Sequence, residues 1–199
     1  MGTREKILAV ALDLFNKEGT QKITTNHIAK AARISPGNLY YHFKNKEQII
    51  RELYALMREK IGFEEMDLPE DLCQTLLYCR YVAGVWWEFR FFRKEMMVLI
   101  EKDGELKRMV ITDNRAQLEK LDHLIEHLLS KGYLRKSVKE AHLPTLIMMF
   151  SQFWMPYLQL TDQHIDKERA LGVATEVKRL FVPYLSEKAE LNLKICKGV

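Results

Sequence analysis

The sequence is poor in residues that cross-link small folds or interrupt long helices: among 199 residues there are three cysteines, five prolines and nine glycines. Cys73, Cys79 and Cys196 cannot all pair with one another, and their spacing fits neither a zinc site nor a redox pair. This cysteine content excludes a disulfide-dense secreted scaffold and is typical of a cytoplasmic protein.

The sequence also lacks a clear membrane segment. Before Asp13 and Lys17 no apolar stretch is long enough for a signal peptide. One long run, residues 143–161, carries no charge, but it includes Pro144, Pro156 and glutamines whose polar groups lipid cannot satisfy. We therefore expect a helix buried between other helices or in a subunit interface, and no membrane partner.

Net charge is modest overall but unevenly distributed. The chain has 31 Lys and Arg against 27 Asp and Glu, a formal charge of +4. Residues 1–60 hold eleven basic and six acidic side chains, a net +5, so the remaining 139 residues carry −1. An anionic partner is thus expected at the N-terminal end alone.

Apolar residues recur with a period near 3.6 almost throughout, and no window alternates as a strand would. The pattern predicts an all-α fold. Expected helices cover 4–17, a short segment after Thr24 or Thr25, a short segment opened by Ser35 and Pro36, a fourth opened by a capping box of Asn45 and Gln48, and then 70–89, 92–101, 105–131, 140–160 and 165–185.

Residues 24–46 read as two short helices joined by a three-residue turn, with the small Ala29 where the helices approach each other. This is the pattern of a helix-turn-helix, which places the N-terminal end of its second helix in the major groove of DNA. We expect a DNA-binding domain at 1–46, a linking helix at 46–60, and a larger helical domain at 61–199 for ligand binding and dimerisation.

The second helix of this motif carries side chains suited to DNA. Gly37 allows close backbone approach, and Asn38 offers a donor and an acceptor to a base edge. Tyr40, Tyr41 and His42 add hydrogen-bonding groups and flat faces. Such exposed aromatic and amide groups favour a binding surface over a merely solvated helical corner, which is the alternative interpretation.

Helix starts supply candidate phosphate contacts. Thr25 and Asn26 begin the first helix of the motif, where free amides and the dipole favour an anion. Lys46 begins the fourth helix, where that dipole disfavours a cation, so a nearby phosphate would explain it.

The pattern Gly37-x-Leu39-Tyr40-x-His42-Phe43-x-x-Lys46, preceded by Thr24-Thr25 and Ile28-Ala29, resembles the DNA-binding domain of the TetR family of bacterial transcriptional regulators over residues 4–60. The resemblance implies a homodimer that binds a nearly palindromic operator and leaves it when a small ligand enters the C-terminal domain. It assigns DNA contacts to Thr25, Asn26, Gly37, Asn38, Tyr40, Tyr41, His42 and Lys46.

One residue departs from the family pattern. Arg33 occupies the turn where glycine is common, and a left-handed backbone there would cost an arginine about 1 kcal/mol relative to glycine. The sequence leaves open an activator, a regulator without a ligand, and a helical ligand-binding protein that does not bind DNA.

The C-terminal part is rich in aromatic residues and methionine, which are typical of a core and also suit an apolar or aromatic ligand. The run from Trp87 to Glu95, followed by 103–106, resembles the C-terminal domain of one subgroup of TetR-like regulators. The candidate ligand residues are Tyr81, Trp86, Trp87, Phe91, Met97, Met149, Phe153 and Trp154. Helices 140–160 and 165–185 are the expected dimer interface, and the linking helix is expected to transmit the ligand signal.

His123, Glu126 and His127 spell H-x-x-E-H, an order found in some zinc proteases. They lie in a leucine-rich stripe, and no third ligand follows at a recognisable spacing. A zinc-dependent hydrolase stays a remote alternative; the expectation is a protein that is not an enzyme and needs no metal or cofactor.

Overall fold

The computed structural model describes residues 2–62, 67–161 and 165–196. Within these ranges the chain is helical and contains no strand; Leu134 and Leu185 form one isolated bridge. The chain forms two compact units. The N-terminal unit comprises Met1–Gly62 together with Phe89–Met109, and the C-terminal unit comprises Phe63–Glu88 together with Val110–Val199.

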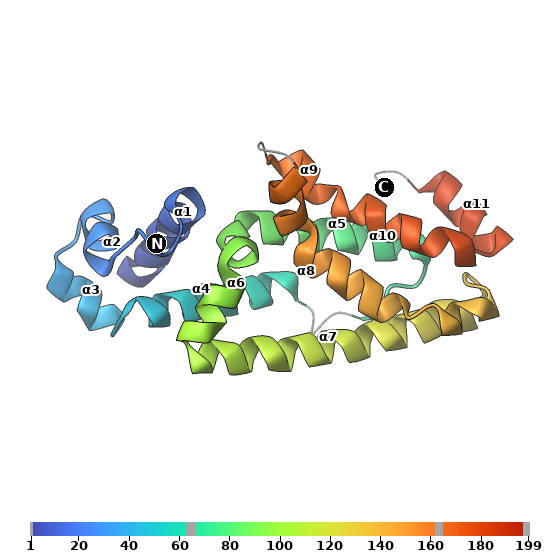
Figure 1. The fold of residues 1–199 in the computed structure, drawn as a ribbon, viewed down its shortest axis with the longest axis horizontal. Coiled ribbons are helices and arrows are strands. Elements are labelled where there is room, and N and C mark those ends of the chain that lie inside the picture. Colours follow the sequence, from blue (N-terminus) through green and yellow to red (C-terminus); the bar gives the residue numbers. More distant parts are fainter. Residues whose placement is uncertain (1, 63–66, 162–164, 197–199) are drawn as a thin grey trace. The chain divides into compact units, whose positions relative to one another are not determined.

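The N-terminal unit is built from α1 (Thr3–Glu18), α2 (Thr25–Ala31), α3 (Pro36–His42), α4 (Lys46–Ile61), α6 (Arg90–Lys102) and the first residues of α7 (Gly104–Ser130) (Figure 1). The first four helices follow the predicted ranges closely. In this unit α6 was not expected, because the sequence indicated one continuous domain over 61–199.

Aromatic packing explains why α6 belongs to this unit. Phe91 and Phe92 are almost completely buried. The ring of Phe91 lies 5.3 Å from that of Phe15 on α1, and the ring of Phe92 lies 5.6 Å from that of Tyr54 on α4. Burying two phenyl groups contributes about 2–3 kcal/mol each, so α6 is a structural part of the N-terminal core.

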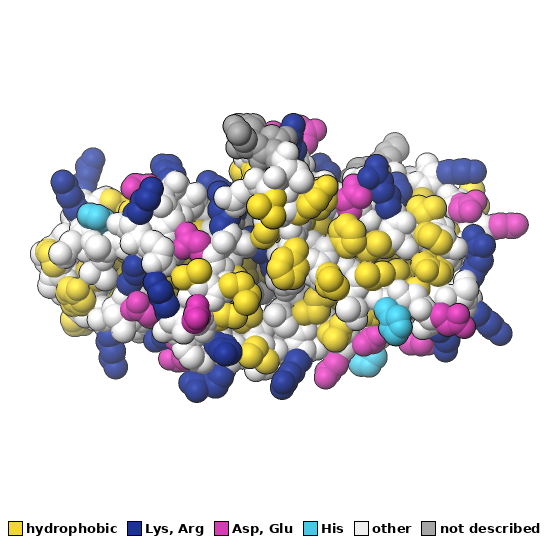
Figure 2. Space-filling view, viewed as in Figure 1, with side chains coloured by type: hydrophobic (Ala, Val, Ile, Leu, Met, Phe, Trp, Pro, Cys, Tyr) yellow, Lys and Arg dark blue, Asp and Glu magenta, His cyan; other side chains and the backbone are white. Residues whose placement is uncertain are grey.

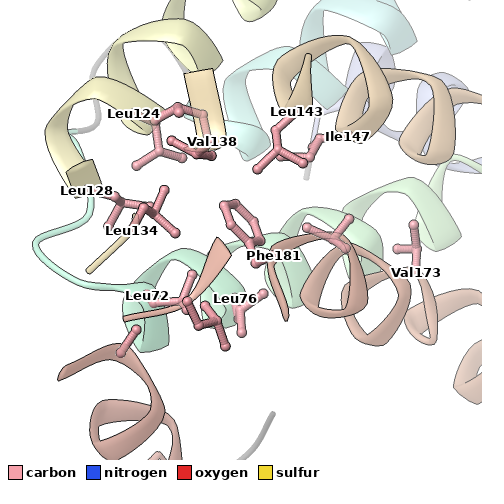
Figure 3. Packing of buried hydrophobic residues seen from close by; sticks show 14 of the residues in the cluster. Leu72, Leu76, Leu124, Leu128, Leu134, Val138, Leu143, Ile147, Val173 and Phe181 are labelled. Carbon is pink, nitrogen blue, oxygen red and sulfur yellow. The ribbon is translucent and has the colours of Figure 1, made fainter. Parts of the chain in front are cut away.

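The C-terminal unit contains α5 (Leu72–Glu88), the rest of α7, the 3₁₀ helix η1 (Lys136–Glu140), α8 (Leu143–Thr161), α9 (Lys167–Leu171), α10 (Val173–Phe181), η2 (Val182–Tyr184) and α11 (Glu187–Ile195). Here α5 and α10 lie side by side (Figure 1). In Figure 3 Phe181 lies at the centre of the buried cluster, among Leu76 of α5, Leu128 of α7 and Leu143 of α8.

Two helix predictions need correction. The single helix expected at 165–185 is divided into α9, α10 and η2: Gly172 separates the first two, and Pro183 lies in the 3₁₀ turn that follows. A further helix, α11, begins after Ser186, whose side chain accepts a hydrogen bond from the Ala189 amide. The apolar spacing in the sequence continues across Gly172 because residues on both sides of this glycine are buried in the same core. The sequence pattern therefore did not show the break between α9 and α10.

None of the described helices is long and apolar enough to cross a bilayer. The charge-free run predicted to be a helix is α8, and its buried side chains, among them Leu143, Ile147 and Met155, pack within the C-terminal unit.

Candidate DNA-binding surface

The local sequence builds the α2–turn–α3 arrangement in the expected way. The hydroxyl of Thr24 accepts a hydrogen bond from the His27 amide (3.3 Å), and the His27 ring accepts one from the Thr24 amide (3.4 Å). The Ser35 hydroxyl accepts a bond from the Asn38 amide (3.1 Å), with proline at the start of α3. These caps set where both short helices begin.

The turn between the helices needs a left-handed residue, and Arg33 supplies it with φ of 54°. Its amide donates to the Lys30 carbonyl, and the Ile34 amide donates to the Ala29 carbonyl, both at 3.1 Å. The expected backbone cost of arginine at this position, about 1 kcal/mol relative to glycine, therefore applies.

One side of α3 is buried and the other faces solvent. Leu39 and the following Phe43 are completely buried, whereas Tyr41 is 84% exposed and Tyr40 is 51% exposed. The Tyr40 hydroxyl lies 2.9 Å from the Thr25 hydroxyl at the start of α2, so a hydrogen bond connects the two helices at the surface. The exposed side chains of α3 are thereby held in a defined orientation.

The structure places Thr25 and Asn26 at the start of α2 and Gly37 and Asn38 at the start of α3, while Tyr40, Tyr41 and His42 lie at the end of α3. Asn26, Gly37 and Asn38 are exposed; Thr25 and His42 are partly buried. At Gly37 a Cβ would meet only the Ser35 hydroxyl, at 3.9 Å, so packing within the chain does not require glycine there.

Lys46 has a structural role that the sequence did not reveal. Its ammonium group donates to the carbonyl oxygens of Thr20 (2.7 Å) and Ile23 (3.0 Å), in the loop between α1 and α2. These two carbonyl acceptors explain why a cation stands at the start of α4, so a DNA phosphate is not needed to explain it. An ammonium group has three N–H donors, and these contacts use two of them.

A second set of contacts fastens the same loop to α6. The Glu95 carboxylate accepts from the Thr20 amide (3.1 and 3.2 Å) and from the Thr20 hydroxyl. Gly19 has φ of +81°, and a Cβ there would lie 2.7 Å from the Glu95 Oε1 atom. Glycine at this position therefore allows both the backbone turn and the close approach of Glu95.

An ion pair holds the junction of α6 and α7 to α4. Arg51 lies 2.6 Å from Asp103 and 3.3 Å from Glu105. Burial raises the pKa of Asp103, but the hydrogen bond from the Leu106 amide and then the Arg51 guanidinium outweigh burial, so the pKa lies below its ordinary value. Sequence reasoning missed Glu95 and Asp103 because each contacts residues more than fifty positions away.

The structure divides the candidate ligand residues between the units. Phe91 belongs to the N-terminal core, and Met97, in the same unit, is 70% exposed. In the C-terminal unit Trp86 is buried, whereas Tyr81 is 53% exposed. Packing against Phe15 thus accounts for Phe91 without a ligand.

The remaining candidates lie on α5 and α8. Trp87 is partly buried on α5, and Met149 and Phe153 are more than half exposed on α8. The Trp154 indole donates to the Arg169 carbonyl (3.0 Å) and stacks on Tyr157.

The H-x-x-E-H residues lie on α7. His123 is exposed, and Glu126 lies 3.6 Å from the Lys139 ammonium group. Across the described part of the chain no three His, Cys, Asp or Glu side chains gather as a metal site would require. Leu124, within this motif, and Leu128, directly after it, are buried in the core.

The cysteine interpretation was wrong in one respect. Cys73 and Cys196, which are 123 residues apart, form a disulfide, and Cys79 is a free thiol. Sequence spacing could not reveal this pair because the fold, and not a local motif, brings the two residues together.

Taken with its capped helices, left-handed turn and exposed α3 face, the N-terminal unit is a helix-turn-helix domain. The comparisons with known families agree. A family described as "Bacterial regulatory proteins, tetR family" matches residues 7–53, and one described as "Bacterial transcriptional repressor" matches residues 47–193. The chain belongs to the tetR family of bacterial regulators.

Individual relatives match different shares of the chain. The regulator AcrR of Shigella flexneri is 40% identical over 65 residues, 33% of this chain and 30% of AcrR. The probable acrEF/envCD operon repressor of Escherichia coli K12 is 27% identical over 140 residues, 68% of this chain and 56% of that protein. The chain thus spans between about a third and just over half of these relatives.

Solved structures extend the similarity to the whole fold. A TetR-family regulator from Marinobacter aquaeolei VT8 has a TM-score of 0.86 and 29% identity, with 99% of this chain and 98% of that chain covered. SmeT in complex with triclosan has a TM-score of 0.67, covers 95% of this chain and 94% of its own, and at 18% identity shows a shared fold alone.

Proposed function

We propose that this protein is a homodimeric, sequence-specific DNA-binding repressor that leaves a palindromic operator when a small apolar or aromatic molecule binds. The exposed face of α3 carries the proposal: it presents Asn38 and Tyr41 to solvent above a buried Leu39. It acts where bacterial chromosomal DNA is found, in the cytoplasm.

DNA contact accounts for features that packing within the chain does not explain. Glycine is not required at position 37 by any neighbouring atom, but a close DNA backbone would require it. A tyrosine that is 84% exposed, as Tyr41 is, suits stacking and hydrogen bonding at a base edge. The starts of α2 and α3 would bind phosphates through their amides, with Thr25 and Asn26 beside them.

Dimerisation is supported by an apolar face on α8. Five of its side chains are at least a third exposed and are spaced three or four residues apart along the helix, so that they share one side: Leu146, Met149, Phe153, Tyr157 and Leu160. Figure 2 shows hydrophobic side chains gathered over this part of the surface. A second copy of the chain is the proposed occupant, because a two-fold dimer places two α3 helices about 34–36 Å apart for successive major grooves.

Ligand release is proposed from the family and from the aromatic content of α5 and α8. SmeT has been solved in complex with triclosan. A ligand that binds more tightly to a conformer with a different spacing of the α3 helices lowers operator affinity by mass action. The linking helix α4 is the proposed path for this change.

Selection of bound duplexes from a random pool tests the proposal. We expect a palindromic consensus, bound by two chains. Asn38→Ala and Tyr41→Ala should weaken binding to that consensus by about 1–3 kcal/mol per altered contact, with little change for random duplexes. Recovery of no enriched sequence, or of an asymmetric site bound by one chain, would contradict the proposal.

The salt dependence of DNA affinity separately tests the predicted contact between Lys46 and a DNA phosphate. Lys46→Ala should reduce the slope of log K against log salt by about one per subunit. Lys17→Ala is the matched control, because it removes the same charge from an ammonium group already paired with Asp13 at 2.7 Å. An unchanged slope for Lys46→Ala would mean that Lys46 does not contact a phosphate and only binds the two carbonyl oxygens.

A further inference from the structure

The disulfide connects the beginning of α5 to the end of α11. Cys73 lies in the first turn of α5, and Cys196 directly follows α11. Their Cα atoms are 5.7 Å apart, within the ordinary range for a disulfide. Both cysteines are partly exposed, so small oxidants and reductants in solution can reach them.

Contacts that do not involve sulfur hold the two cysteines close together. The side-chain oxygen of Asn192 on α11 accepts a hydrogen bond from the Cys73 amide (3.0 Å), and its NH₂ group donates to Asp71 (3.1 Å). Ala189 of α11 is completely buried in the core cluster. Besides the disulfide, these contacts hold the start of α5 next to α11.

The third cysteine, Cys79, is unsuited to disulfide formation. Burial raises the pKa of the Cys79 thiol to about 12, and the thiolate is the nucleophile in disulfide formation. Cys79 also lies six positions after Cys73 on α5, on a different face of the helix.

We propose that Cys73 and Cys196 are a reversible redox site, oxidised by hydroperoxides, whose disulfide fastens α11 to α5. The inference rests on the proposed function, because a protein that acts on chromosomal DNA works in a reducing compartment, where disulfides are transient or redox-sensing. The C-terminal unit then exists in two covalent states, one with the disulfide and one with two free thiols.

The chemistry balances without a cofactor. One thiolate attacks an oxygen of hydrogen peroxide, breaks the O–O bond and becomes a sulfenic acid, and the leaving hydroxide is protonated to water. The second thiol attacks the sulfenic sulfur, forms the S–S bond and releases another water molecule. Two electrons pass from the sulfur atoms to the peroxide, and a dithiol reductant reverses the reaction by exchange.

The oxidation state should change the local stability of α11. Apart from the disulfide, the contacts that hold this helix include the Asn192 hydrogen bonds, the Lys188 hydrogen bond to the Lys131 carbonyl and the burial of Ala189, while Leu191 and Ile195 are more than half exposed. Closing a loop over 123 residues removes much of the freedom of the opened state. Amide exchange in α11 should therefore be slower in the oxidised protein.

The full chain, reduced and then treated with stoichiometric hydrogen peroxide, provides the first test. We expect a mass loss of about 2 Da, one remaining alkylatable cysteine after denaturation, and a 73–196 cross-linked peptide. Cys73→Ser and Cys196→Ser should abolish the cross-link, and Cys79→Ser should leave it intact. Intermolecular cross-links, or a bond that involves Cys79, would overturn the proposal.

Hydrogen exchange provides the second test. Exchange in α11 should be at least about tenfold slower in the oxidised than in the reduced protein, with no such difference in Cys73→Ser. Equal exchange in both states would refute the fastening role. Duplex selection on the reduced protein is independent of both results, so failure of the redox site and failure of the DNA-binding proposal are distinguishable.

Discussion

Removing the Glu95 carboxylate should loosen the loop that joins α1 to α2. Thr20 is 1% exposed, and its amide and hydroxyl both donate to Glu95. In Glu95→Ala these donors lose a charged acceptor. A buried donor left without a partner costs about 1–3 kcal/mol, so the two together should cost about 2–6 kcal/mol.

The amide of Thr20 reports this loss directly, because its exchange rate depends on local opening. A change of about 2–6 kcal/mol corresponds to about 30- to 25,000-fold faster exchange at a position that opens locally. Glu95→Gln keeps one acceptor oxygen and should show an intermediate effect. DNA affinity should fall as well, since the Thr20 carbonyl is an acceptor for Lys46.

Glu101→Ala is the matched control, since Glu101 is exposed on the same helix. It removes the same charge without touching the loop. If the Thr20 amide exchanged no faster in Glu95→Ala than in Glu101→Ala, the Glu95 carboxylate would not be what holds this loop.

Three other predictions follow from the described contacts. Folding lowers the pKa of Asp103, so the ionised carboxylate stabilises the folded protein. This contribution is fully present above the ordinary pKa of about 3.9 and is lost as pH falls through the lower folded value. The difference in unfolding free energy between wild type and Asp103→Asn should therefore be constant from about pH 7 to 5 and shrink below about pH 4. Tyr40→Phe removes the 2.9 Å contact with Thr25 and should change the unfolding free energy by no more than about 1 kcal/mol while weakening duplex binding, as titration with a selected duplex would measure. Leu160→Glu should yield monomers in sedimentation, whereas Leu191→Glu, an exposed leucine on α11, should not; a dimer that survives the first change would refute the α8 interface.

The helix-turn-helix of the N-terminal unit was largely predictable because the residues that mark its helix starts lie close together in the sequence. Ser35 followed by proline, and Asn45 three residues before Gln48, mark helix starts through contacts within one turn. One detail differs: the Gln48 side chain accepts from the Lys44 amide, so the capping box at Asn45 is only half formed. The left-handed backbone at Arg33 was considered only as a condition, because the family that the sequence resembles often has glycine at this position.

The boundaries of the C-terminal helices were less predictable. The division of 165–185 at Gly172 does not interrupt the apolar period, because α9 and α10 bury residues in the same unit. The start of α11 carries a local signal, Ser186 followed by two glutamates, that could have identified it.

By itself, the sequence determined the all-helical class and the helix-turn-helix, because each depends on residues within a few positions of one another. The charge asymmetry that favours an anionic partner follows from composition alone. Only the tertiary structure decided that α6 belongs to the DNA-binding unit, that Glu95 and Lys46 hold the same loop, and that Cys73 meets Cys196. The physical reason is distance along the chain: burial and pairing between residues tens of positions apart leave no periodic or capping signal in the sequence.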